Sequence, residues 1–85
     1  MFGLEPSYSA KKSLEIFKKH NIKNILELGA GLGRDTIYFA KNNIKVYALD
    51  FSPCAIDTIN KKSKKLGLDK LITAEVFDVL SLIHI

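Results

Sequence analysis

Three acidic residues stand where short apolar segments of the chain end, and one of them lies two residues before a glycine-rich loop. Glu27 precedes the loop 29–33, which carries three of the chain's five glycines, and Asp50 and Asp78 follow the next two apolar segments. Glycines allow a sharp turn and let backbone N–H groups approach a ligand closely. A carboxylate after the second segment can accept both hydroxyls of a ribose, and one before the loop suits a ligand with a positive end. The pattern predicts a nucleotide-like cofactor site.

The elements that position these residues follow from the hydrophobic pattern. Apolar residues at helical spacing predict helices at about 9–20, from 34 or 35 to 41, and from 53 to about 66. Short apolar runs predict strands at 24–28, 45–49 and 71–77. Strands that alternate with helices predict right-handed crossovers and a parallel sheet. The fold class is therefore α/β, a Rossmann-like parallel sheet with flanking helices in the order α-β-α-β-α-β, and ligands bind such sheets beyond the carboxyl ends of the strands.

Local signals set the helix boundaries. Ser7 or Ser9 is expected to cap the first helix, and Ser52 to cap the third, with Pro53 in its first turn. Asparagines at 42–43 close the second helix, because asparagine tolerates the left-handed conformation. Four residues at helical spacing are expected to form one stripe of the third helix: Ile56, Ile59, Ser63 and Leu66.

Composition narrows the function classes. The chain of 85 residues has 47% hydrophobic and 26% charged residues, as expected for a single soluble domain. No apolar run reaches the ~20 residues of a membrane span, and the N-terminus lacks the features of a signal peptide. The single cysteine, Cys54, indicates a reducing, cytoplasmic compartment and is expected to be a small packing residue. His20 and His84 are too isolated to form a metal site.

The net charge of +4 comes largely from lysines in one helical segment, Lys61, Lys62, Lys64 and Lys65. Aromatic residues do not interleave with these lysines, and nucleic-acid motifs do not surround them. We therefore expect a solvated helix face and not a nucleic-acid surface.

The segment 27–33, Glu-Leu-Gly-Ala-Gly-Leu-Gly, resembles the first motif of class I S-adenosylmethionine-dependent methyltransferases. The segment 46–52, ending in Asp50-Phe51-Ser52, resembles their second motif, and Phe77-Asp78-Val79 resembles their third. The overall run is similar to small methyltransferases of the tellurite-resistance type. A dinucleotide fold of the G-x-G-x-x-G type is disfavoured, because Arg34 stands at its third glycine position.

The resemblance implies a role for each motif residue toward S-adenosylmethionine. Glu27 would interact with the ammonium group, Asp50 with the ribose hydroxyls and Phe51 with the adenine ring. Asp78 would accept from the adenine amino group, and the backbone N–H of Val79 would meet a ring nitrogen. Two roles stay open for Arg34: it would contact the cofactor carboxylate, or it would form an outward salt bridge. The loop would pass under the methionine portion through Gly29, Ala30, Gly31 and Gly33.

A full domain of this family has a larger sheet, in which a further strand pairs with the free side of the first. We therefore expect residues 1–85 to form a single truncated cofactor-binding domain, about half of a methyltransferase domain. The open edge of the strand 24–28 and the apolar tail 80–85 are expected to drive self-association. Two functions stay open: a methyltransferase portion with an unknown acceptor and unknown catalytic residues, or a non-catalytic cofactor-binding or self-associating half-domain.

Overall fold

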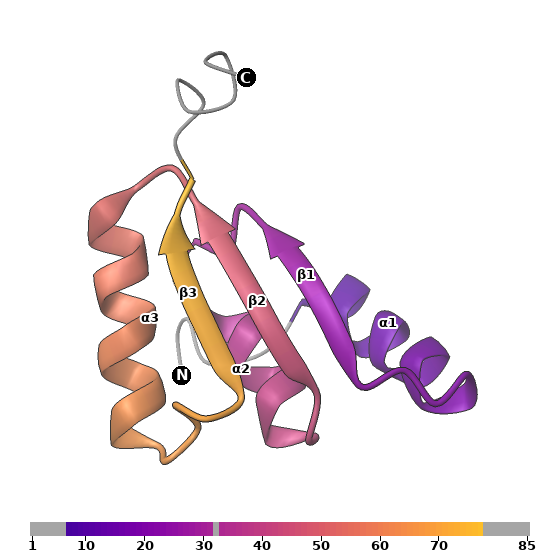
Figure 1. The fold of residues 1–85 in the computed structure, drawn as a ribbon. Coiled ribbons are helices and arrows are strands. Elements are labelled where there is room, and N and C mark those ends of the chain that lie inside the picture. The colour runs from indigo at the N-terminus through magenta and orange to yellow at the C-terminus, as the bar shows by residue number, and fades with distance from the viewer. Residues whose placement is uncertain (1–6, 32, 78–85) are drawn as a thin grey trace, which may run out of the picture.

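The computed structural model describes residues 7–31 and 33–77. The described chain forms three helices and three strands in strict alternation (Figure 1). The elements are α1 (Tyr8–Lys19), β1 (Asn24–Leu28), α2 (Arg34–Lys41), β2 (Lys45–Asp50), α3 (Pro53–Lys65) and β3 (Ile72–Val76). Asp78, Val79 and the apolar tail lie outside the described residues. The expected order of elements is confirmed; β3 is one residue shorter at each end than expected, and β2 includes Asp50.

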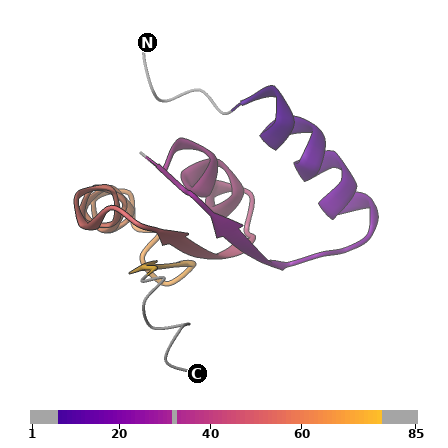
Figure 2. The ribbon, with the colours of Figure 1, turned by 90° about the horizontal axis from the view of Figure 1, so that it is seen from above.

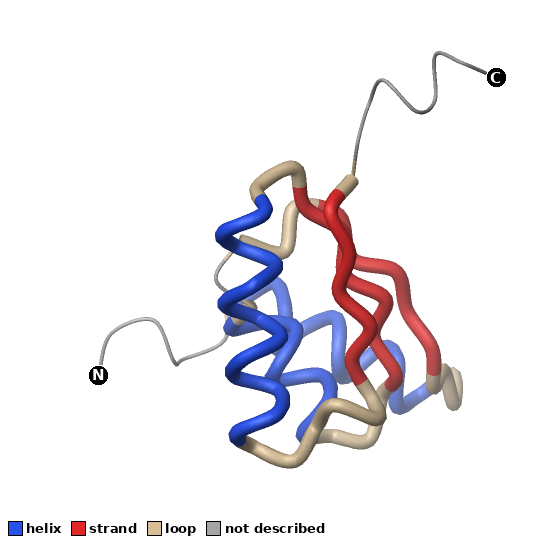
Figure 3. The backbone as a smooth tube through the Cα atoms, turned by 60° about the vertical axis from the view of Figure 1, so that its left-hand side comes forward, coloured by secondary structure: helices blue, strands red, loops and turns tan. Residues whose placement is uncertain are grey.

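The strands form one parallel sheet in the order β1-β2-β3. The register aligns Leu26 of β1 with Tyr47 of β2, and Tyr47 with Thr73 of β3. All three helices lie on one side of this sheet (Figures 2 and 3). The α/β Rossmann-like fold class is therefore confirmed, and among the described strands β1 is an edge.

The N-terminus of α1 is fixed by Ser7, whose hydroxyl accepts from the backbone N–H of Ala10 at 3.0 Å. The same serine donates to α2, through its backbone N–H and its hydroxyl, and both bonds of 2.9 Å end on the carboxylate of Asp35. Phe17 of α1 packs on Phe39 of α2 with ring centroids 5.6 Å apart. These contacts hold α1 against α2 beside the edge strand.

Capping and turn residues in the sequence mark the start of α3 and the ends of α2 and α3. Ser52 caps α3 by accepting from Ala55 at 3.2 Å, and Pro53 occupies the first turn, as expected. Past α2, Asn43 adopts a left-handed backbone with φ of 64°, and Gly67 does the same after α3 with φ of 72°. Each positive φ turns the chain back toward the sheet for the next strand.

The core lies between the helices and one face of the sheet. It consists of two clusters of buried apolar side chains. The first contains Ala10, Leu14, Phe39, Ile44, Val46 and Ala48, and the second Ile37, Ala40, Ile56, Ile59 and Ile72. Of the stripe expected on α3, Ile56, Ile59 and Ser63 are buried, whereas Leu66 is the C-cap and stays half exposed over the gap between α2 and α3.

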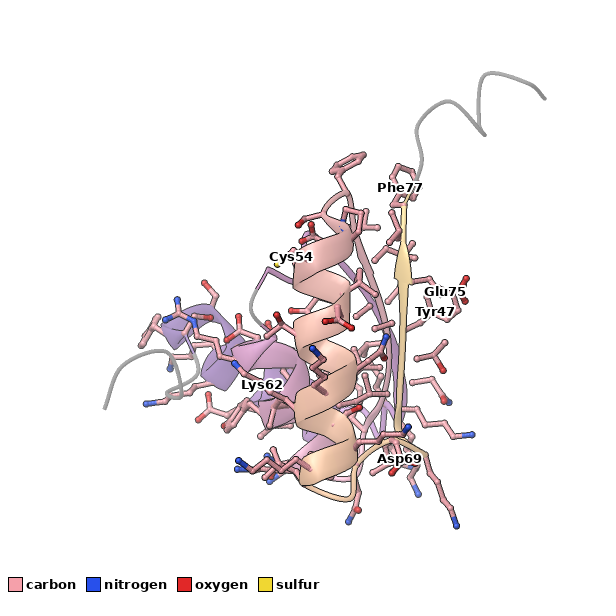
Figure 4. The ribbon with its side chains drawn as sticks, turned by 90° about the vertical axis from the view of Figure 1, so that its left-hand side faces the viewer. Tyr47, Cys54, Lys62, Asp69, Glu75 and Phe77 are labelled. Carbon is pink, nitrogen blue, oxygen red and sulfur yellow. The ribbon has the colours of Figure 1, made fainter. Side chains whose placement is uncertain are left out.

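The opposite face of the sheet is not covered by any described element. Leu26 and Leu28 of β1 are 61% and 68% exposed, and Tyr47 of β2 is also exposed. In Figure 4 the side chains of Tyr47 and Glu75 stand on this face, on the far side of β3 from α3. Within residues 7–31 and 33–77, none of the helices is long and apolar enough to cross a membrane.

Candidate cofactor site at the carboxyl ends of the strands

The loop after β1 contains glycines with left-handed backbone. Gly29 and Gly31 have φ of 69° and 60°, and a side chain added at either would meet no atom within 4 Å. The Gly29 N–H donates to the carbonyl of Leu49 at 2.7 Å, which ties the start of the loop to the end of β2. The loop backbone is therefore both held in place and open to the surroundings, as a close approach to a ligand requires.

The third glycine has a different role. Gly33 is buried, has φ of 82° and caps α2; a Cβ there would lie 2.6 Å from Cγ1 of Ile59 in α3. Its carbonyl accepts from Ile37 at 2.8 Å in the first turn of α2. Gly33 thus allows α3 to pack closely on the start of α2. The motif alone does not reveal this constraint.

Asp50 connects the two loops at this edge of the sheet. One carboxylate oxygen accepts from the Ser52 N–H at 2.9 Å, and the other accepts from the Gly31 N–H at 2.8 Å. These bonds hold the pKa of the Asp50 carboxyl below its usual value, and the bond from Ser52 has the larger effect. The carboxylate is therefore ionised at neutral pH, and each oxygen retains a lone pair for a further donor.

Two aromatic rings lie beside Asp50. Phe51 is 63% exposed, and its ring meets that of Phe77 edge to face with centroids 5.2 Å apart. The Phe77 N–H donates to the Asp50 carbonyl at 2.8 Å. Residues from the ends of β2 and β3 therefore place an apolar surface next to a fixed carboxylate. Phe77 stood in the third motif, but its contact with Phe51 depends on the parallel pairing of β2 with β3.

Glu27 lies below the loop on the helix side of the sheet. It accepts a hydrogen bond from the hydroxyl of Thr36, which is fully buried in α2. Burial raises the pKa of the Glu27 carboxyl; the bond from Thr36 opposes this, and the charge of Asp35 adds to it. Sequence reasoning missed Thr36. A polar residue on the buried face of a short helix, one turn past a glycine loop, was the available signal.

Several other sites predicted from the sequence lie elsewhere. Arg34 lines a cleft between α2 and α3. Cys54 is exposed at the start of α3 (Figure 4), so the expectation that it is a small packing residue is wrong. Among residues 7–31 and 33–77, His, Cys, Asp and Glu side chains do not gather in a group of three that could hold a metal ion.

A parallel sheet with a glycine loop after the first strand and an ionised carboxylate after the second defines a Rossmann-like fold, in which ligands bind beyond the carboxyl ends of the strands. Residues 25–83 match the family model of the methyltransferase domain. Phosphoethanolamine N-methyltransferase 1 of Triticum aestivum is 43% identical over 70 residues. The chain belongs to the methyltransferase domain family, and the predicted resemblance to class I S-adenosylmethionine-dependent methyltransferases is confirmed.

Solved structures share the fold. A proposed caffeoyl-CoA O-methyltransferase from Staphylococcus aureus superposes with a TM-score of 0.78 at 17% identity, over 94% of this chain and 39% of that one. An S-adenosylmethionine-dependent methyltransferase from Aquifex aeolicus gives a TM-score of 0.64 at 28% identity, over 81% and 38%. The wheat match spans 80% of this chain and 13% of its relative. The chain thus spans well under half of these proteins.

Proposed function

We propose that this chain binds S-adenosylmethionine at the carboxyl ends of β1 and β2, as the cofactor-binding portion of a methyltransferase. Bound there, the cofactor supplies a methyl group activated by a sulfonium centre. The observation that carries the proposal is Asp50, an ionised carboxylate fixed between the glycine loop and the start of α3. Membership of the methyltransferase domain family supports the same ligand.

The other residues have roles that suit this ligand. Phe51 offers an exposed ring to a flat apolar group such as adenine. The open backbone at Gly29 and Gly31 admits a ligand close to the loop. Glu27, held by Thr36, provides negative charge for an ammonium group. The roles of Asp78 and Val79 toward the adenine stay predictions, and the methyl acceptor is unassigned. The single cysteine supports a cytoplasmic location for the protein.

Titration calorimetry with S-adenosylhomocysteine tests this proposal. We expect saturable binding that Asp50→Ala weakens at least about tenfold, because charged acceptors of ribose hydroxyls contribute strongly. Asp69→Asn is the control: it also removes one carboxylate charge, but Asp69 lines a hollow beside α3 together with Asn60 and Lys64. Absence of binding to folded protein, or equal weakening by both variants, would contradict the proposal.

A second function is favoured by the uncovered side of the sheet: a self-associating module without turnover. The carbonyl of Lys23 accepts from Lys45 and the N–H of Gly29 donates to Leu49, so odd-numbered positions of β1 turn their backbone groups toward β2. By alternation, Asn24, Leu26 and Leu28 turn theirs to the free edge. The two leucines also carry exposed side chains on the uncovered face. Unpaired backbone and exposed apolar side chains on the same residues favour pairing with another chain.

Light scattering at tens of micromolar protein tests the second function. We expect a mass above that of the monomer, which Leu26→Lys reduces to the monomer mass. Ile16→Lys is the matched control, since Ile16 is similarly exposed, at 55%, but lies on α1. A monomeric wild type refutes self-association without affecting the cofactor proposal, and methyl transfer to any acceptor excludes a module without turnover.

A further inference from the structure

A second candidate site lies between α2 and α3, on the helix layer. It is a cleft of about 320 Å³, within the size range of small-molecule sites. Its lining comes from one stripe of each helix: Arg34, Ile37 and Lys41 of α2 and Lys62, Lys65 and Leu66 at the end of α3. The spacing on each helix puts its three residues on one face. Figure 4 shows Lys62 on the side of α3 away from β3.

The lining of this cleft combines apolar and positively charged side chains. Ile37 and Leu66 provide an apolar floor, and the other four residues are cations. Among the described residues of the lining there is no carboxylate, and two nearby acids are engaged elsewhere: Asp57 pairs with Lys61 at 3.0 Å, and Asp35 binds Ser7. Lys62 has an interaction of its own, so its charge is not counted toward a ligand. The positive charges of Arg34, Lys41 and Lys65 around one apolar hollow attract an anion more strongly than any of them does alone.

The simplest structural explanation accounts for only part of this arrangement. Lys41, Lys62 and Lys65 lie in the last turns of their helices, where a cation is favoured by the helix dipole. Arg34 is the first residue of α2, where the dipole disfavours a cation. The guanidinium nevertheless lines the same cleft as the lysines. Capping therefore does not explain why all four charges gather around Ile37 and Leu66.

We propose that this cleft binds a small amphipathic anion, with a short apolar body over Ile37 and Leu66 and one carboxylate or phosphate group held by the cationic rim. A planar phosphate or carboxylate contact suits Arg34, and the lysines act as point charges. The site is separate from the glycine loop and does not depend on the proposed cofactor. It also gives a function to part of the lysine-rich segment that the sequence predicts to be only solvated.

Calorimetry at low salt with four probes tests the site on the full chain: octanoate, octyl phosphate, octanol and inorganic phosphate. We expect saturable binding of octanoate, octyl phosphate or both, at least about tenfold tighter than octanol or inorganic phosphate, because charge and apolar contact add. The tighter of the two anionic probes identifies the head group. Equal binding of octanol, equal binding of inorganic phosphate, or no binding overturns the proposal.

Paired variants separate the cleft from general electrostatics. Lys41→Gln with Lys65→Gln is expected to weaken the anionic probe at least about tenfold. Lys61→Gln with Lys64→Gln removes the same charge from residues that line a different hollow, and is expected to change binding by less than about twofold. Equal weakening by both pairs overturns the site. If the variant with Lys41→Gln and Lys65→Gln does not fold, Leu66→Asn tests the apolar floor of the cleft instead. Unchanged binding of octyl phosphate and octanoate to that variant also overturns the site.

Discussion

The two faces of the sheet use the same three strands in opposite ways. On the helix side, Val46, Ala48 and Ile72 are at most 5% exposed, whereas on the other side Leu26 and Leu28 are more than half exposed. Yet β1 carries two leucines on the uncovered face, as is typical of strands buried on two faces, whereas β3 carries Glu75 there. The difference teaches that the described elements draw their stability from one face. The other face is not covered by the described elements, and the loops at the strand ends are held by bonds to one another and to β2.

The largest expected effect separates the two faces directly. Ala48→Glu puts a carboxylate at a position that is 0% exposed, and we expect a loss of more than about 4 kcal/mol, enough to unfold a small domain. Leu26→Glu adds the same side chain to the uncovered face and is expected to leave the protein folded. Thermal unfolding followed by circular dichroism measures both. Similar melting of the two variants would mean that the faces are equally buried in solution.

A smaller effect is expected at the third glycine of the loop. Gly33→Ala combines a φ of 82° with a clash against Ile59, so we expect a loss of about 2–4 kcal/mol. Gly67→Ala has a similar φ of 72° but meets no atom within 4 Å, so only the backbone cost of about 1 kcal/mol applies. Chemical denaturation gives both values. Equal losses would show that packing on α3 adds nothing at Gly33.

Much of the fold was predictable because local signals agree with the tertiary structure. Serine caps, Pro53, the apolar strands and the turn at Gly67 each specify one boundary without help from distant residues. The glycine loop and Asp50 were predictable for the same reason, since strand ends meet at one edge of a parallel sheet.

The features of the fold and the site that were not predictable depend on contacts between segments far apart in the chain. Thr36 meets Glu27 only once α2 has packed on the sheet, and Ile59 meets Gly33 only once α3 has packed beside α2. The cationic cleft likewise joins two helices, so neither lysine spacing nor composition revealed it. The single-sided burial was also hidden, because an apolar strand looks the same whether one or both of its faces are covered.

Glu27 tests how burial on the helix side of the sheet affects an ionisable side chain. Its pKa is raised above the ordinary 4.5, chiefly by burial, so the folded state holds the proton more tightly than the unfolded chain. This contribution to stability is present below the ordinary pKa and is lost as the pH rises through the folded-state pKa. Glu27→Gln keeps an acceptor for Thr36 without the charge. We expect the variant to match the wild type in acid and to melt at a higher temperature at neutral pH.

Melting curves across this pH window test the expectation for Glu27. Asp69→Asn is the control for the loss of a carboxylate outside the core. A wild type that gains stability over Glu27→Gln as the pH rises would mean that Thr36 more than offsets the cost of burial.

The smallest effect belongs to the uncovered face. The Tyr47 hydroxyl donates to Glu75 at 2.7 Å, and this bond is the main cause that raises the pKa of Tyr47 above 10.0. Glu75→Gln is expected to lower that pKa toward its ordinary value and to leave the melting temperature unchanged, since both side chains are exposed. Asp69→Asn, the same charge change at the other end of the sheet (Figure 4), should leave Tyr47 unaffected. Site-specific NMR titration of the Tyr47 ring reads the shift. A melting temperature that falls with Glu75→Gln would show that this face is covered in solution, and that the contrast between the two faces is smaller than the described elements imply.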